Sequence, residues 1–264
     1  MARTRPDPIR PVLGLALVLT TGCSGPASDS KSPAGADSAP PAPDTQDSGT
    51  GPELPAPLAP FTVTRFDPVE LGLPTTTPIG YGGPGVAAGD LDGDGDDDLV
   101  WVSPRGWGLL LWNDGDGSLT PGDRLPGANG VSMSDPDHDG DLDILLLTDD
   151  ADLLLWNDGD RSFRTIPINE ADRMSVSASW ADLNGDGILD LFIARYSREL
   201  NGELILDEGG EGDGNAIYLG SADGALTHSP DALDELARIG LTFHGAWVDA
   251  DGDHDLDLYV VKDF

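Results

Sequence analysis

The sequence predicts an all-β fold made of repeated four-stranded units, and two observations lead to this prediction. A cluster of aspartates recurs at intervals of 45, 47 and 67 residues, and its copies begin at Asp90, Asp135, Asp182 and Asp249. In addition, the octapeptide LLLWNDGD occurs at 109–116 and again at 153–160. A repeat of this length indicates several copies of one supersecondary unit.

Each unit predicts the same order of short strands. A strand rich in small residues leads into the acidic loop, as at 86–89, 177–180 and 245–248. An apolar strand leaves the loop, at 99–102, 144–147, 191–194 and 258–261. The third strand ends in an aromatic residue, which is Trp112, Trp156 or Tyr218. A hairpin turn then leads to a last strand, expected near 118–120 and 162–166.

Four short strands per unit are typical of a β-propeller blade. We therefore predict an incomplete β-propeller of about three and a half four-stranded blades, near residues 61–125, 126–168, 169–230 and 231–264. The last unit ends after its second strand, so we expect the chain to be a fragment of a longer propeller. The stretch 61–66 is a candidate for an outer strand that closes the ring.

The third unit is longer because it contains an acidic, glycine-rich insertion from Ser197 to Gly214. We expect a tolerated surface insertion, and a binding loop or lid is the alternative. Most of the six tryptophans recur at equivalent strand positions, so we expect them to pack between blades, with Trp107 as the exposed exception.

The first 23 residues have the pattern of an export signal. Three arginines precede an apolar run from Val12 to Leu19, which is too short to span a bilayer as a stable helix. Cys23, the only cysteine, follows this run after a small residue. The pattern resembles a bacterial lipobox, which implies lipidation of Cys23 and anchoring of the exported protein to the outer membrane or cell surface. An ordinary cleaved signal is the alternative.

Residues 24–60 consist almost wholly of Ser, Pro, Ala, Gly, Asp and Thr. Such a segment buries too little apolar surface to offset the entropy of ordering, so we predict a disordered tether. The propeller is then expected at 61–264.

The charge balance points to cations as partners. The chain has 48 Asp and Glu against 14 Lys and Arg, a formal net charge of -34. Nucleic acids and anionic lipid surfaces bind to basic surfaces, so neither is expected as a partner. We expect membrane contact only through the lipid anchor at Cys23.

The four acidic loops predict calcium sites. Carboxylates at alternate positions converge when the chain curls tightly, and glycine at position 6 allows that curl in three loops. Oxygen-only ligands in a flexible loop favour Ca²⁺, and up to four ions are expected, one per loop. Positions 1, 3, 5, 7 and 9 supply the candidate ligands, position 7 through its carbonyl: Asp90, Asp92, Asp94, Asp96 and Asp98; Asp135, Asp137, Asp139, Asp141 and Asp143; Asp182, Asn184, Asp186, Ile188 and Asp190; Asp249, Asp251, Asp253, Asp255 and Asp257.

The pattern D-x-D-x-D-G-x-x-D between two strands resembles the FG-GAP or VCBS-type repeat of integrin-like β-propellers. The resemblance covers about residues 61–264 and implies a calcium loop between the first two strands of each blade. Two loops depart from the pattern. Asn184 lowers the charge of the third loop, and His254 replaces the position 6 glycine of the fourth, where we expect strain.

No catalytic residues are predicted. The four histidines form no zinc-binding pattern, and the chain has no nucleophile elbow or phosphate-binding loop. We expect a binding or adhesion module for a protein or carbohydrate ligand. The alternatives are the non-catalytic propeller of a larger secreted enzyme, such as a polysaccharide lyase or hydrolase, and a structural component of the cell envelope.

Overall fold

The computed structural model describes residues 16–19, 62–65, 71, 73, 85–104, 106–116, 118–169, 173–196 and 214–262. Cys23, the predicted tether at 24–60 and most of the insertion, 197–213, lie outside the described residues. Contacts divide the chain into two units, 1–67 and 68–264.

In the first unit, strands β1 (Ala16–Leu19) and β2 (Thr62–Arg65) form a two-stranded antiparallel sheet. The stretch 61–66 therefore contains a strand, as expected. Within the described residues its partner is β1, and its role in closing a ring stays a prediction.

In the second unit, three sheets each contain four antiparallel strands in sequence order. The first sheet contains β3 (Gly85–Gly89), β4 (Asp98–Val102), β5 (Trp107–Trp112) and β6 (Thr120–Pro126). The second contains β7 (Gly130–Ser134), β8 (Asp143–Leu147), β9 (Leu153–Asn157) and β10 (Phe163–Pro167). The third contains β11 (Ser175–Ala181), β12 (Asp190–Arg195), β13 (Ala216–Leu219) and β14 (Thr227–His228).

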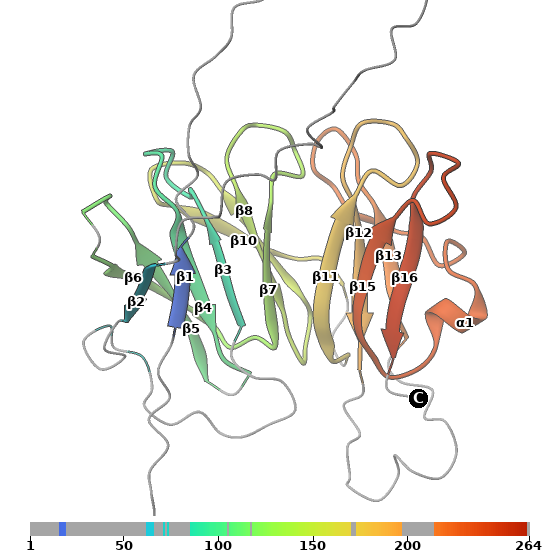
Figure 1. Cartoon of the computed structure of the whole chain (residues 1–264), viewed down its shortest axis with the longest axis horizontal. Coiled ribbons are helices and arrows are strands. Elements are labelled where there is room, and N and C mark those ends of the chain that lie inside the picture. The colour runs from blue at the N-terminus through green and yellow to red at the C-terminus, as the bar shows by residue number, and fades with distance from the viewer. Residues whose placement is uncertain are drawn as a thin grey trace, which may run out of the picture. The chain divides into compact units, whose positions relative to one another are not determined.

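A fourth sheet has two described strands, β15 (Thr242–Val248) and β16 (Asp257–Lys262). The short helix α1 (Glu235–Arg238) precedes it. The sheets stand side by side like blades, with β3, β7, β11 and β15 as neighbours in that order (Figure 1). The chain is thus all-β and forms an incomplete β-propeller, which confirms the predicted fold class.

The second strands of the two middle sheets, β8 and β12, are buried on both faces because a neighbouring sheet covers each face. In β8, Ile144 and Leu146 join the core shared with the first sheet, whereas Leu145 and Leu147 join the core shared with the third. This alternation follows from the two-residue period of a strand. It explains why these strands are continuous apolar runs in the sequence.

Small residues in the first strands allow neighbouring sheets to approach closely. At Gly130 of β7, a Cβ atom would lie 2.7 Å from the carbonyl oxygen of Val176 in β11. Trp101, Trp112 and Trp156 are buried, and Trp107 is half-buried with its ring 5.9 Å from that of Trp101.

Two strand predictions need correction. The last strand of the first blade is predicted near 118–120, but β6 covers Thr120–Pro126 and begins where Thr120 pairs with Trp112 at the end of β5. β7 is a first strand that the small-residue pattern does not predict, because its sequence GVSMS contains one glycine and no alanine.

The fourth sheet is much more exposed than its counterparts. Tyr259 of β16 is 67% exposed and Phe243 of β15 is 48% exposed, whereas every residue of β4 and β8 is buried. Within the described residues no third strand pairs with β16. One face of the fourth sheet packs on the third sheet, and no described sheet follows it on the other face. Among those same residues, no helix is long and apolar enough to cross a membrane.

Candidate metal centre

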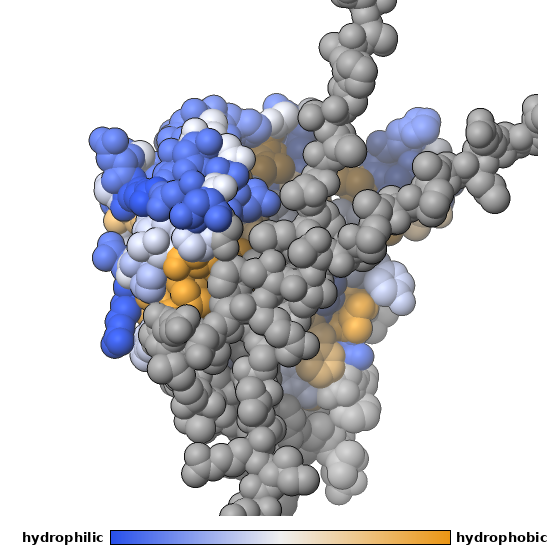
Figure 2. Space-filling view, turned by 60° about the vertical axis from the view of Figure 1, so that its left-hand side comes forward, coloured by the Kyte–Doolittle hydropathy of each residue, from blue (hydrophilic) through white to orange (hydrophobic). Residues whose placement is uncertain are grey.

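Each of the four acidic loops connects the first and second strands of its sheet. They join β3 to β4, β7 to β8, β11 to β12 and β15 to β16, so all four lie at the same end of the strands (Figure 1). Figure 2 turns the first sheet toward the viewer and shows hydrophilic residues gathered at its upper end, with hydrophobic residues below. The fold therefore concentrates the carboxylates on one rim.

The loops share one hydrogen-bonding pattern. In the first loop, Gly95 N donates to Asp90 Oδ2 at 2.9 Å, Asp94 N to Asp92 Oδ1 at 3.2 Å, and Asp96 N to Asp94 Oδ1 at 2.9 Å. The equivalent three bonds recur in the other loops. The backbone thus holds the side chains at positions 1, 3 and 5 before any ion binds.

The loops curl because two positions take left-handed backbone angles. At position 6, Gly95, Gly140 and Gly187 have φ values of 95°, 99° and 85°, which confirms the role predicted for these glycines. His254 occupies the same position in the fourth loop with a φ of 77°. A residue with a Cβ is strained there, as expected from the sequence. Position 4 is also left-handed, and His138 holds it in the second loop with a φ of 57°.

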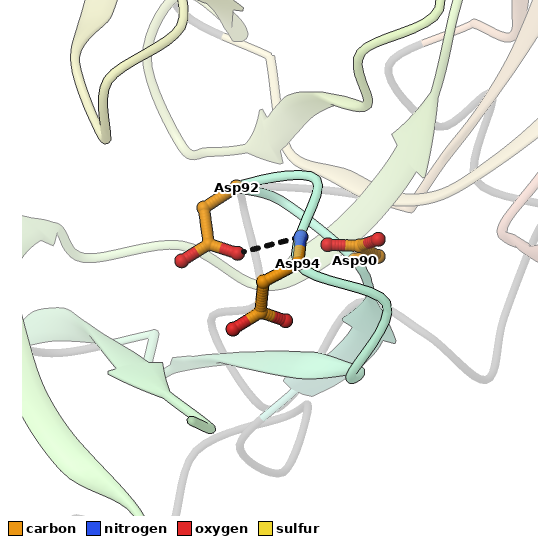
Figure 3. Close-up of side chains that lie close together, drawn as sticks. All are labelled: Asp90, Asp92 and Asp94. Carbon is orange, nitrogen blue, oxygen red and sulfur yellow. Dashed lines mark hydrogen bonds between the residues drawn. The ribbon is translucent and has the colours of Figure 1, made fainter. Parts of the chain in front are cut away.

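In three loops, carboxylate oxygens from three residues lie within 4.8 Å of one another and could hold a metal ion. Figure 3 shows the first of these groups, with the hydrogen bond from Asp94 N to Asp92. In the fourth loop the position 9 residue joins the group and position 5 does not. The groups are Asp90, Asp92 and Asp94; Asp135, Asp137 and Asp139; Asp249, Asp251 and Asp257.

The third loop brings fewer carboxylates together. Asn184 replaces the position 3 aspartate, and no group of three acidic side chains converges there in the described structure. Asn184 Oδ1 still accepts the Asp186 N–H at 2.9 Å, so the loop keeps its shape with less charge.

The position 7 side chains take no part in these groups. Asp96, Asp141, Ile188 and Asp255 instead donate their backbone N–H to the position 5 side chain. The Asp253 carboxylate raises the pKa of Asp255 through a side-chain hydrogen bond and its charge.

The position 9 aspartates clamp each loop to its sheet, a role that the sequence reasoning missed. Asp98 accepts the Leu91 N–H at 3.0 Å and the Asn113 N–H at 2.9 Å. Asp190 accepts the equivalent N–H groups of Leu183 at 3.0 Å and Gly220 at 2.8 Å. One carboxylate thus connects position 2 of the loop to the end of the third strand.

Asp143 makes only half of this clamp. Its Oδ1 accepts the Asn157 N–H at 2.7 Å, but Oδ2 is buried and has no hydrogen-bond partner among the described residues. The reason is Pro136, which occupies position 2 and has no N–H to donate. Burial, and then the charges of Asp137, Asp139 and Asp135, raise the pKa of Asp143 to about 7.

A buried carboxylate oxygen without a donor, beside three converging carboxylates, is a costly arrangement for the protein alone. A bound cation compensates both the missing hydrogen bond and the repulsion. The residues of the second loop therefore fit a hard divalent cation. The donors are oxygens only, which is the set that Ca²⁺ takes.

One basic side chain reaches a candidate metal loop from the next blade. Arg161, in the β9–β10 turn, donates its Nε–H to Asp92 at 2.7 Å and an Nη2–H to Asp114 at 2.7 Å. Its guanidinium lies 4.7 Å from the Trp112 ring centroid. Arg161 therefore neutralises part of the charge of the first loop and connects the first two sheets.

The comparison with protein families agrees with this architecture. Residues 135–193 match the family model of an FG-GAP-like repeat. The match begins at the first aspartate of the second loop and ends within β12. A search of curated proteins found no match. The chain therefore carries an FG-GAP-like repeat within an incomplete β-propeller. This is the type of repeat that its acidic loops resemble in sequence.

Proposed function

We propose that the acidic loops bind Ca²⁺, up to four ions, and that the ions hold the junction between the first two strands of each blade. The observation that carries this proposal is the buried, unpartnered Oδ2 of Asp143 beside the Asp135, Asp137 and Asp139 carboxylates. When bound, Ca²⁺ supplies positive charge where these carboxylates repel one another most strongly.

The residues of the loops have defined roles in this proposal. Those at positions 1, 3 and 5 offer one carboxylate oxygen each in the first two loops, and Asp257 replaces position 5 in the fourth. Backbone N–H groups already fix these side chains, so binding orders few additional groups. We rank the third loop as the weakest site because Asn184 carries no charge.

We further propose that the propeller is a non-catalytic binding or adhesion module for a protein or carbohydrate ligand. Lipidation at Cys23 and the segment 24–60 would then tether it to the bacterial cell envelope. The presence of an FG-GAP-like repeat supports a propeller module. The non-catalytic part of a larger secreted enzyme and a structural envelope component are the other functions consistent with this fold.

Calcium titration of the full chain tests the proposal. We expect heat of binding in calorimetry and a rise in melting temperature, at about 5–10 °C per site when Ca²⁺ exceeds its dissociation constant a hundred-fold. Asp137→Asn removes one charge but keeps the oxygen that accepts the Asp139 N–H. It should reduce the total heat and the thermal shift.

Asp123→Asn is the matched control, because Asp123 is an exposed residue of β6 outside the loops. It should leave the titration unchanged. No heat and no thermal shift with the unmodified chain would refute the proposal, and so would equal effects of the two substitutions.

A further inference from the structure

A cavity of about 570 Å³ lies beside the third sheet and is unusually basic for this chain. It lies near the ends of β12 and β13 that are remote from the acidic loop. Three of the chain's 14 basic side chains line it, together with one histidine, one tyrosine and two asparagines: Arg173, Arg195, Arg238, His228, Tyr218, Asn169 and Asn215.

Arg195 forms part of the cavity wall and is only 4% exposed. Its Nη1 donates to the Gly214 carbonyl oxygen at 3.1 Å and its Nη2 to the Tyr218 hydroxyl at 3.2 Å. Its Nε has no hydrogen-bond partner in the described part of the chain. A buried guanidinium with an unused N–H and no ion-paired carboxylate is costly unless an anion approaches it.

The charge of Asp152 interacts with that of Arg195, but Asp152 does not supply the missing partner of the Arg195 Nε–H. The oxygens of Asp152 already accept hydrogen bonds from Thr148 N, Ser175 Oγ and Asn169 Nδ2. The positive charge of Arg195 lowers the pKa of Asp152, but burial dominates and raises it. Among the described ion pairs, none joins the two residues.

The rim adds further positive charge, together with aromatic and apolar side chains. Arg238, at the end of α1, is exposed and makes no ion pair with any described residue. The His228 ring lies 5.3 Å from the Tyr218 ring, and Pro230 and Leu233 complete this side. Guanidinium groups around a partly apolar hollow suit an organic ligand that carries an oxyanion.

We propose that this cavity binds a small organic ligand through a carboxylate or sulfate group, which Arg195 and Arg238 contact. The acidic loop of the same sheet does not prevent this. It ends at Asp190, and β12 continues from there to Arg195, about 17 Å away along the strand. That separation exceeds the Debye length of about 8 Å at physiological ionic strength, so the loop charge is largely screened.

Calorimetry or saturation-transfer NMR of the full chain in excess Ca²⁺ tests the proposal. D-glucuronate is the probe, D-glucose is its neutral counterpart, and inorganic sulfate shows whether any oxyanion suffices. We expect glucuronate to bind, glucose to bind at least ten-fold more weakly, and sulfate to compete if the charged group alone is recognised. Arg238→Gln should weaken glucuronate binding about ten-fold, the effect of losing one charge-assisted contact.

Arg124→Gln is the control, because it removes the same charge from an exposed arginine of the first sheet that lies outside the cavity. It should not change binding. A second variant, Arg195→Lys, keeps the buried charge but loses the planar fork and should also weaken binding. Equal binding of glucose and glucuronate, no binding of glucuronate, or equal effects of Arg238→Gln and Arg124→Gln would each overturn the proposal.

Discussion

At the scale of single residues, the position 2 amide decides how much each loop depends on a cation. Leu91, Leu183 and Ala250 donate an N–H to the position 9 carboxylate, at 3.0 Å in each case. Pro136 leaves Asp143 without that bond. One proline thus makes the second loop the place where charge is least compensated by the protein itself.

Pro136→Leu should restore the missing donor, since leucine occupies this position in the first and third loops. We expect the pKa of Asp143 to fall from its raised value near 7, and calcium-free stability to rise by about 1 kcal/mol, the usual net value of a hydrogen bond. Carboxyl NMR titration and urea unfolding measure the two effects. In an Asp143→Asn background the substitution should give no such gain, and an equal gain there would contradict this explanation.

His254→Gly should stabilise the fourth loop, because a left-handed backbone costs a residue with a Cβ about 1 kcal/mol. His228→Gly in β14 is the matched control and should destabilise the protein, since glycine weakens a strand. Thermal unfolding of both variants in calcium-free buffer gives the comparison. A loss of stability in His254→Gly would show that the histidine side chain contributes more than its backbone strain costs.

At the scale of elements, the repeat predicts the strands well because one face-alternating pattern is copied in every unit. The aspartate register and the octapeptide LLLWNDGD place loops and strands directly. Contacts between neighbouring blades could not be predicted from the sequence, because they depend on how the sheets stack. The salt bridge of Arg161 with Asp92 is of this kind. The sequence shows that Pro136 has no N–H. Only the hydrogen bonds of the other loops show that this N–H would donate to the position 9 carboxylate.

Arg161→Gln should increase the calcium affinity of the first loop, because the guanidinium on Asp92 repels an incoming cation. We expect a several-fold tighter site in calorimetry and a lower melting temperature without calcium, since the contact between the first two sheets is lost. Arg124→Gln is matched, because Arg124 also stacks on a tryptophan, 4.2 Å from the Trp107 ring centroid, but makes no ion pair with an acidic loop within the described residues. A weaker first site in Arg161→Gln would mean that Arg161 positions Asp92 for the ion.

At the scale of the whole molecule, the fold separates charge of opposite sign along the strands. The acidic loops lie at one end of the sheets, and the arginine-lined cavity lies near the other end of the third sheet. The sheets between them share continuous apolar cores. Cation binding at the acidic loops and anion binding in the arginine-lined cavity can therefore be tested separately.

The pH dependence of stability should reverse when calcium is present. Asp143 has a folded pKa of about 7, above its ordinary value of 3.8, so the folded state binds more protons than the unfolded state between these values. Without calcium, its contribution to stability should therefore be present at pH 4 and disappear as the pH rises through 7. With calcium, acidification should instead destabilise the protein, because protons displace the ion.

Melting temperatures from pH 5 to 8, with and without calcium, test this expectation. Asp143→Asn should flatten the calcium-free profile over this range. A calcium-free profile that is the same in Asp143→Asn and in the unmodified chain would assign the pH dependence to other carboxylates.

The most direct test of the calcium assignment is a crystal structure of the chain grown with Ca²⁺, with anomalous diffraction to locate the ions. We predict an ion in the second loop, with oxygens of Asp135, Asp137, Asp139 and Asp143 at about 2.3–2.6 Å. An ion-free second loop whose carboxylates point into solvent, in crystals saturated with Ca²⁺, would contradict the account.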